Sequence, residues 1–114
     1  MPDRPYFTTK ARAQRSERKV ADLFKGRLQP ASGALKSVHC KADVKSAHFL
    51  VDAKVTKHQT YTLRLQDWRK LRGEAFQNQR RPAMTVEFAD GTLLVILAQD
   101  MLVRIQRAIE IGTI

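Results

Sequence analysis

The chain has a single cysteine, Cys40, and no long apolar run. One cysteine cannot form an internal disulfide, so the thiol count favours an intracellular protein. The longest apolar run, Leu93 to Ala98, is far too short to cross a bilayer, and Met1 to Lys10 contain no apolar core of a secretion signal. We therefore expect a cytoplasmic protein that is neither secreted nor membrane-spanning.

Acidic residues are also scarce. Against 11 Asp and Glu there are 21 Lys and Arg, which gives a net charge of +10. Such a balance favours polyanions through phosphate contacts and counterion release, so nucleic acid is the first partner to consider. A ribosome-associated protein, a basic soluble protein without a polyanionic partner and a membrane-surface binder remain open on charge alone.

No internal repeat, low-complexity tract or interdomain linker divides the 114 residues. This length is that of one ordinary domain. Residues 1–10 contain two prolines and lack periodicity, so they are expected to form a flexible basic N-terminal arm, and residues 11–114 a single domain.

Hydrophobic periodicity predicts a helix over Ala11 to Lys25, capped by Thr8 or Thr9 and stopped by Gly26. Alternation and turn residues predict the following elements. They are a loop over 28–37, a strand over 38–44, a short turn at Lys45, Ser46 and Ala47, and strands over 48–55 and 60–65. A helix over 67–79 follows, with Trp68, Leu71, Ala75 and Phe76 inward. After Pro82 a strand alternates at Met84, Val86 and Phe88, and an Asp90-Gly91 hairpin leads into a mostly buried strand over 93–97. A last helix is capped by Asp100, with Leu102, Ile105, Ala108 and Ile109 inward. The expected fold is α/β (α+β), a mixed central sheet flanked by helices in the order αβββαββα.

Four residues of this pattern carry potential chemistry. Asp52 and Lys54 share one face of their strand, and Asp43 lies near it if the segments around Ser46 form a hairpin. Glu17 falls inside the apolar stripe of the first helix, where a carboxylate needs a reason. Carboxylates held close together bind Mg²⁺, and a bound divalent ion with a nearby lysine assists phosphodiester hydrolysis.

The pattern resembles the PD-(D/E)xK nuclease superfamily, whose signature is an acid, a spacer, and then acid-any-lysine on the next strand. Here these positions are Asp43 and Asp52-Ala53-Lys54, preceded by a helical glutamate, Glu17. With the Ser32-Gly33-Ala34 loop, the chain looks most like small archaeal-type and phage-type Holliday-junction resolvases. The resemblance covers roughly residues 11 to 97 and implies a restriction-endonuclease-like core. The second acid is Asp where close relatives more often use Glu, and no proline precedes Asp43.

The resemblance implies a metal-dependent endodeoxyribonuclease that cleaves branched DNA in a prokaryotic cell or a phage-infected host. Asp43, Asp52 and Glu17 would hold Mg²⁺, for which Mn²⁺ would substitute, and Lys54 would assist the attacking water. A four-way junction has two symmetric strands to cut, so a homodimer is expected, with strand 93–97 and the last helix as its face. Expected DNA contacts are Ser32, Gly33, Arg4, Arg12, Arg15, Thr56, Lys57, Arg69, Arg72, Arg80 and Arg81.

Other interpretations of these residues remain open. The chain could be another nuclease of this superfamily, with a restriction-like, repair or end-processing role, or an inactive basic DNA-binding module. Asp43 could be a turn residue, and Glu17 could pair with Arg12 or Arg18. A zinc site is disfavoured, because the single thiol and the irregular gaps between His39, Cys40, His48 and His58 match no standard zinc spacing.

Overall fold

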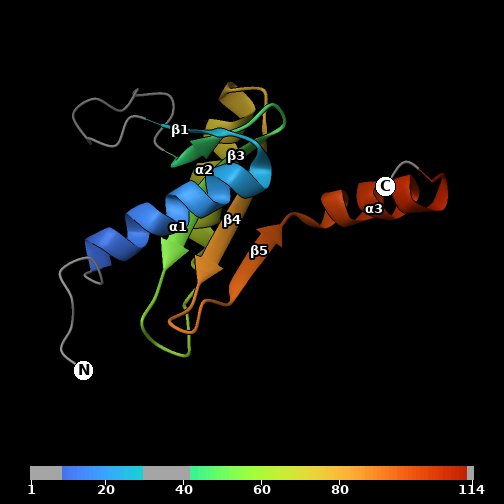
Figure 1. The fold of residues 1–114 in the computed structure, drawn as a ribbon. Coiled ribbons are helices and arrows are strands. Elements are labelled where there is room, and N and C mark those ends of the chain that lie inside the picture. Colours follow the sequence, from blue (N-terminus) through green and yellow to red (C-terminus); the bar gives the residue numbers. More distant parts are fainter. Residues whose placement is uncertain (1–8, 30–41, 113–114) are drawn as a thin grey trace.

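Helices and strands are mixed along the part of the chain that the computed structural model describes, residues 9–29 and 42–112. In order they are α1 (Thr9–Phe24), β1 (Arg27–Leu28), β2 (Val44–Lys45), β3 (Phe49–Val55), α2 (Leu65–Gln77), β4 (Arg81–Glu87), β5 (Leu93–Leu97) and α3 (Gln99–Glu110) (Figure 1). The predicted mixed sheet with flanking helices is confirmed, and the elements follow the predicted order αβββαββα.

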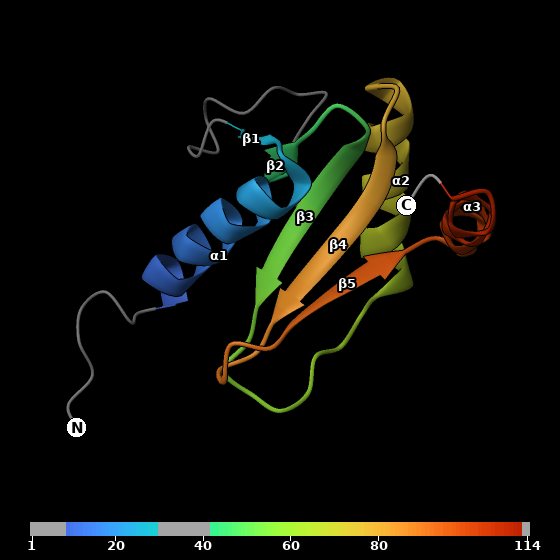
Figure 2. The ribbon, with the colours of Figure 1, turned by 45° about the vertical axis from the view of Figure 1, so that its right-hand side comes forward.

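The sheet has five strands in the order β1-β2-β3-β4-β5. Neighbouring strands are antiparallel except β3 and β4, which are parallel. Because parallel strands need a crossover connection, the chain passes through α2 between them. The two seven-residue strands β3 and β4 therefore lie in the middle of the sheet, as Figure 2 shows.

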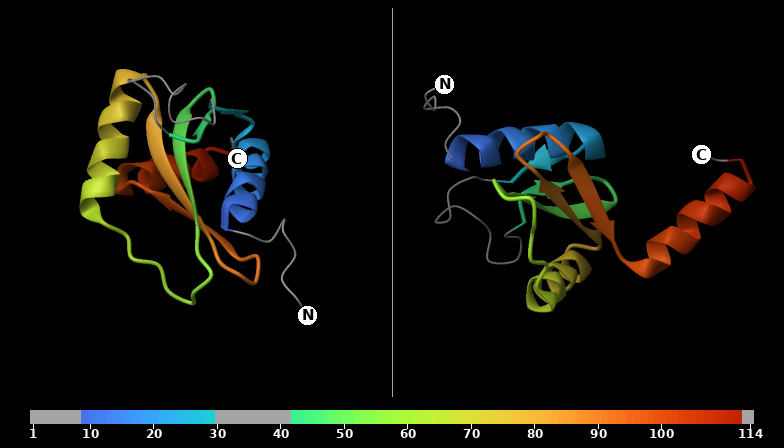
Figure 3. Two further views of the ribbon diagram at one scale, coloured as in Figure 1. Left: turned by 90° about the vertical axis from the view of Figure 1, so that its left-hand side faces the viewer. Right: turned by 90° about the horizontal axis from the view of Figure 1, so that it is seen from below.

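Helices α1 and α2 cover opposite faces of the sheet (Figure 3). Val20 of α1 belongs to one buried cluster with Val51, and Leu71 of α2 belongs to the other with Leu50. Successive side chains of a strand point to opposite faces, so Asp52 lies on the α2 face with Leu50. The predicted alternation along β3 is confirmed.

The turn after α1 requires glycine. Lys25 has a positive φ of 54°, and the N–H of Gly26 donates to the carbonyl of Ala21 at 2.8 Å. A Cβ on Gly26 would lie 2.9 Å from the Lys45 carbonyl oxygen and 3.0 Å from Val44 Cγ1. The predicted stop at Gly26 is confirmed, and glycine lets the chain pass close to β2 as it enters β1.

Of the three strands before α2, β3 lies where it was predicted, β2 overlaps its predicted range only at Val44, and β1 was not predicted. Residues 60–64 form no strand, and Leu65 begins α2. Residues 60–64 pair with none of the five strands of the sheet. The third strand is instead β1, which ends inside the predicted loop. Of the strand predicted over residues 38–44, residues 38–41 lie outside the described range, and β2 continues into Lys45, a predicted turn residue. Phe76, predicted to face inward in the helix that follows, is 83% exposed.

The last strand and the last helix lie where they were predicted, but neither is buried as predicted. Helix α3 forms, but its N-cap is Ala98, and Asp100 lies inside the first turn. None of its residues is buried, and Leu102 and Ile109 are more than half exposed. Strand β5 is likewise exposed at Leu94 and Val95. An apolar stripe shows that a partner is needed but not that it belongs to the same chain. No helix within 9–29 or 42–112 is long and apolar enough to span a membrane.

Candidate active site

The first candidate acid, Asp43, is held at an open edge of β3. Strand β2 pairs with β3 only as far as Val44 opposite Val51, so the next edge N–H of β3 has no strand partner. The N–H of Ala53 donates to Asp43 Oδ2 at 2.9 Å, and the N–H of Asp43 donates to the Val51 carbonyl at 3.0 Å. The hairpin on which this residue's placement depended is therefore present, and its carboxylate points toward the strand that carries Asp52.

Asp52 is a carboxylate in a mostly dry position. Its side chain is 21% exposed, and its Oδ2 lies 3.3 Å from Lys54 Nζ. Burial raises the pKa of Asp52 to about 6; the Lys54 charge opposes this rise, and a hydrogen bond and the charge of Asp43 reinforce it. Asp43, Asp52 and Lys54 thus act on one another, as their predicted roles require.

Lys54 stays charged although it is half-buried. Burial lowers the pKa of Lys54, but the negative charge of Asp52 outweighs that effect with help from Tyr61 and Asp43, so the net shift is upward. Burial also raises the pKa of Tyr61, a residue that sequence reasoning did not connect with the site. Lys54 therefore provides a fixed positive charge beside two carboxylates.

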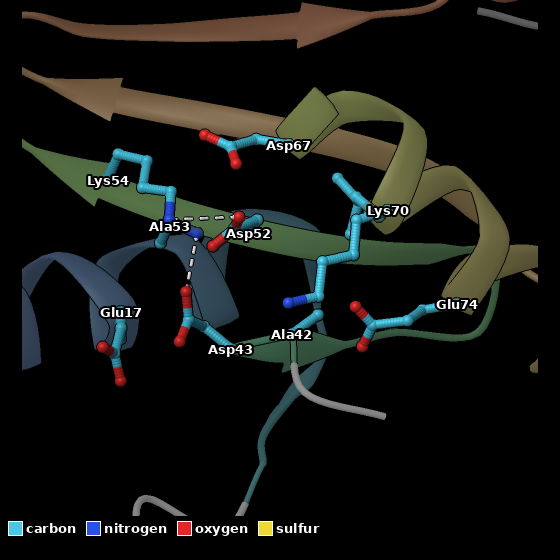
Figure 4. A pocket seen from close by; sticks show the side chains of 10 residues that line it. Glu17, Ala42, Asp43, Asp52, Ala53, Lys54, Asp67, Lys70 and Glu74 are labelled. Carbon is cyan, nitrogen blue, oxygen red and sulfur yellow. Dashed lines mark hydrogen bonds and ion pairs between the residues drawn. The ribbon is translucent and has the colours of Figure 1, made fainter. Parts of the chain in front are cut away.

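These side chains border a hollow of about 340 Å³, the central hollow, which lies between β3, the start of β2 and α2 (Figure 4). Its α2 wall consists of Asp67, Lys70, Leu71 and Glu74, which sequence reasoning missed as site residues. Their spacing of three, one and three residues puts them on one helix face with the buried Leu71, and that periodicity is the signal that could have found them.

Glu17 reaches the same hollow from α1, on the other side of the sheet edge (Figure 4). Its place in an apolar stripe is explained by this position, because the short β2 leaves room beside β3. One nitrogen of the Arg12 guanidinium donates to the Thr56 carbonyl at 2.9 Å. Among the described residues, however, no three His, Cys, Asp or Glu side chains converge as a preformed metal site.

The predicted DNA contacts are dispersed. Arg4, Ser32 and Gly33 lie outside the described residues. Arg80 donates to the Ser46 and Asn78 carbonyls at 2.7 and 2.8 Å, and Arg81 lies 3.7 Å from Asp100, so both have structural partners. The hydroxyl of Thr56 accepts the His58 N–H at 3.1 Å. Of the others, Arg12 lies partly buried, while Arg15, Lys57, Arg69 and Arg72 have exposed side chains.

A second hollow, the basic hollow, lies beside the β2–β3 turn. It measures about 280 Å³, and its lining contains four cations and no carboxylate: Lys25, Gly26, Arg27, Gln29, Lys45, Ser46, Ala47 and Arg80. Of these four cations, only Arg80 was predicted from the sequence as a DNA contact. The hollow joins the end of α1 to β2, a juxtaposition that hydrophobic periodicity does not reveal.

The donor atoms at the central hollow fit Mg²⁺. Asp43 and Asp52 offer hard carboxylate oxygens in mutual contact, and a pair of neighbouring carboxylates is stabilised by a cation. Two protein carboxylates are enough for Mg²⁺, which keeps several waters and completes its coordination with substrate phosphate oxygens. The absence of a third converging acid among the described residues is therefore compatible with the ion.

Comparisons with models of known protein families, with curated proteins and with solved structures found no match to this chain.

Proposed function

We propose that the chain is a Mg²⁺-dependent endodeoxyribonuclease of the PD-(D/E)xK type, acting on branched DNA as a Holliday-junction resolvase and built on a restriction-endonuclease-like core. One observation carries the proposal: Asp43, Asp52 and Lys54 meet at one sheet edge, with Asp52 mostly buried and beside another acid. A buried carboxylate pair is unfavourable without a cation, and such strained pairs concentrate at functional sites.

Each residue has a role that follows from its position. Asp43 and Asp52 hold Mg²⁺, and Glu17 orients the ligands of the ion from the α1 side. When bound, the ion offsets the negative charge that develops on the phosphoryl oxygens. Lys54, whose ammonium lies 3.3 Å from Asp52, orients the attacking water and donates to the same phosphate. Asp52 must be ionised to hold the ion, and in the metal-free protein burial raises its pKa to about 6, so Mg²⁺ must compete with a proton below that pH.

The charge distribution supports DNA as the substrate. The chain carries +10 although its proposed centre is acidic, so the positive charge lies elsewhere. Part of it gathers in the basic hollow, where Lys45 is paired opposite Leu50 of the same β3 that carries Asp52. At about 3.3 Å per residue, Leu50 and Asp52 are roughly 7 Å apart along the strand, about the distance between neighbouring phosphates of one DNA strand. Phosphate contacts of this kind position a nuclease without reading sequence.

The proposal is tested with synthetic four-way junction, flap and linear duplex DNA in the presence and absence of Mg²⁺. We expect cleavage of the junction by the unaltered protein, and a loss of about a thousandfold or more in Asp52→Asn and Lys54→Ala, with junction binding retained. Titration calorimetry should show Mg²⁺ binding to the unaltered protein and to Lys54→Ala but not to Asp52→Asn.

The control is Asp22→Asn, a conservative change of an exposed acid of α1, which should leave cleavage and Mg²⁺ binding unchanged. Equal cleavage of all three DNAs would exclude the resolvase assignment and retain the nuclease. Junction binding without any cleavage, together with no Mg²⁺ binding, would instead identify a DNA-binding module.

A further inference from the structure

Helix α3 is an amphipathic helix without a packing partner among the described residues of its own chain. Met101, Leu102, Ile105, Ala108 and Ile109 recur at helical spacing and form one apolar stripe. None of the helix is buried, and Leu102 and Ile109 are 56% and 57% exposed. Within residues 9–29 and 42–112, no other helix or strand packs substantially against α3. Figures 1 and 3 show it projecting beyond the sheet from the end of β5.

An unfilled apolar hollow lies at the base of this helix. It measures about 300 Å³ and is lined without exception by apolar side chains: Leu63, Leu65, Trp68, Ile96, Leu97 and Ala98. Leu63 and Leu65 are about half exposed there, at the segment that leads into α2. Beside it, the edge strand β5 exposes Leu94, so a continuous apolar surface runs from the start of α2 across the end of β5. Apolar surface gathered in one place indicates an interface.

The stripe and the hollow belong to one chain but do not meet within it. Ala98 lines the hollow and is also the N-cap of α3, so the helix begins at the rim and runs away from it. The exposed Arg81–Asp100 ion pair, 3.7 Å long, joins the start of β4 to the first turn of α3. A second copy offers the matching stripe, and a twofold axis lets each helix cover the other chain's hollow, so every contact forms twice.

Charge also favours a second copy over other occupants. The whole chain carries +10, so two copies repel unless the surfaces that meet are neutral. α3 carries two arginines, Arg104 and Arg107, and two acids, Asp100 and Glu110. A helix that lies on an anionic membrane is instead rich in Lys and Arg on its polar face. The balance on α3 therefore fits a like copy.

A homodimer is already the expectation from the sequence; we propose that it forms by exchange of α3, in which the Leu102–Ile105–Ile109 stripe of each copy occupies the apolar hollow at Trp68 of the other. Strand β5 then lies at the interface. Each chain keeps its own central hollow, which is lined by other residues than the apolar hollow. The dimer does not depend on the proposed nuclease activity, since none of the interface residues belongs to the central hollow.

The test compares two substitutions on opposite sides of α3 by sedimentation equilibrium. Leu102→Asp puts a charge in the stripe, and Val103→Asp puts the same charge on the far side of the helix, at a residue of similar exposure, 46%. The unaltered chain and Val103→Asp should sediment at twice the 13.0 kDa chain mass, and Leu102→Asp at the chain mass. The dissociation constant of the dimer should be at least a hundredfold higher for Leu102→Asp.

Trp68 is the only tryptophan of the chain and lies in the hollow, so its emission reports directly on the hollow's occupant. Dilution of the unaltered protein should shift this emission to longer wavelength together with the loss of dimer, and Leu102→Asp should show the shifted emission at every concentration. Helical circular dichroism of Leu102→Asp should fall by no more than the contribution of α3, because a twelve-residue helix without a partner is only marginally stable in water.

A cross-link decides whether the helices are exchanged. In a Cys40→Ser background, a chain with Ile105→Cys mixed with a chain with Leu65→Cys should form a disulfide-linked pair of unlike chains. A monomeric unaltered protein, with or without anionic vesicles, would overturn the proposal. So would a dimer that survives Leu102→Asp, or one that forms no cross-link between unlike chains.

Discussion

The central hollow buries a charged group, whereas the C-terminal surface formed by β5 and α3 exposes apolar groups, and both arrangements are unfavourable in water. In the central hollow a charged group, Asp52, is withdrawn from water beside a second acid. On the C-terminal surface, apolar groups such as Leu102 and Ile109 are exposed to water. Neither arrangement stabilises an isolated chain. The difference indicates what would relieve each: a cation in the first region, and an apolar surface of a second chain in the second.

The largest expected effect tests which region holds the chain together. Leu50 is fully buried in the α2 cluster, so Leu50→Ala should lower the free energy of unfolding by about 2–5 kcal/mol through lost burial and a cavity. Leu102→Ala removes the same atoms from an exposed helix, and at concentrations where the protein is monomeric it should change the free energy of unfolding by less than about 0.5 kcal/mol. Urea unfolding of both variants measures this. Equal effects would mean that α3 packs on its own chain.

A smaller and opposite effect is expected from the buried acid. Asp52→Asn should stabilise the metal-free protein at pH 8 by roughly 1–3 kcal/mol, because it removes a charge whose pKa is raised from 3.8 to about 6. Loss of the attraction to Lys54 reduces this gain, which sets the lower end of the range. The raised pKa means that the contribution of Asp52 to stability is fully present below about pH 4 and is lost as the pH rises through about 6.

The advantage of the Asn variant should therefore vanish near pH 4 and reach its full size by about pH 7. Thermal unfolding from pH 4 to pH 8, with both proteins in a chelator, checks the sign. An advantage that is independent of pH would show that amide packing, not charge, is responsible.

Mg²⁺ affinity should depend on pH for the same reason. A cation requires the ionised carboxylate, so binding must displace the proton that Asp52 holds below its pKa of about 6. Between pH 7 and pH 5 the affinity for Mg²⁺ should fall by about tenfold, as calorimetry in two buffers of different protonation enthalpy would show together with proton release. Constant affinity over this range would remove Asp52 from the set of ligands.

The smallest expected effect concerns the basic hollow. Arg27 is exposed and its charge serves no ion pair that the structure shows within the described residues, so Arg27→Ala should leave folding and Mg²⁺ binding intact. It should weaken junction binding several-fold at low salt and reduce the slope of log affinity against log salt by about one, the expected result for one lost phosphate contact. An unchanged slope would place the DNA elsewhere on the protein.

Local sequence patterns predicted the structure correctly where a residue's environment depends on its neighbours in the sequence. Alternation along residues 48–55 correctly sent Leu50 and Val51 to opposite faces, and Gly26 correctly ended the first helix. They failed where the partner is distant in sequence. Residues 60–65 alternate like a strand, but they pair with no strand of the sheet and lead into α2 instead. Asp67, Lys70 and Glu74 of α2 line the central hollow through contacts that are also distant in sequence, because the crossover between β3 and β4 packs α2 over β3.

The sequence by itself determined the residue types at the centre, the face of β3 on which Asp52 and Lys54 lie, and the amphipathic character of α3, since each follows from periodicity within one element. Only the tertiary structure decided that Asp43 caps the open edge of β3 at Ala53, that Glu17 borders the same hollow, and that no other described helix or strand covers the stripe of α3. These depend on which strand pairs where and on which faces meet. Contacts between distant segments set both, and no local pattern records them.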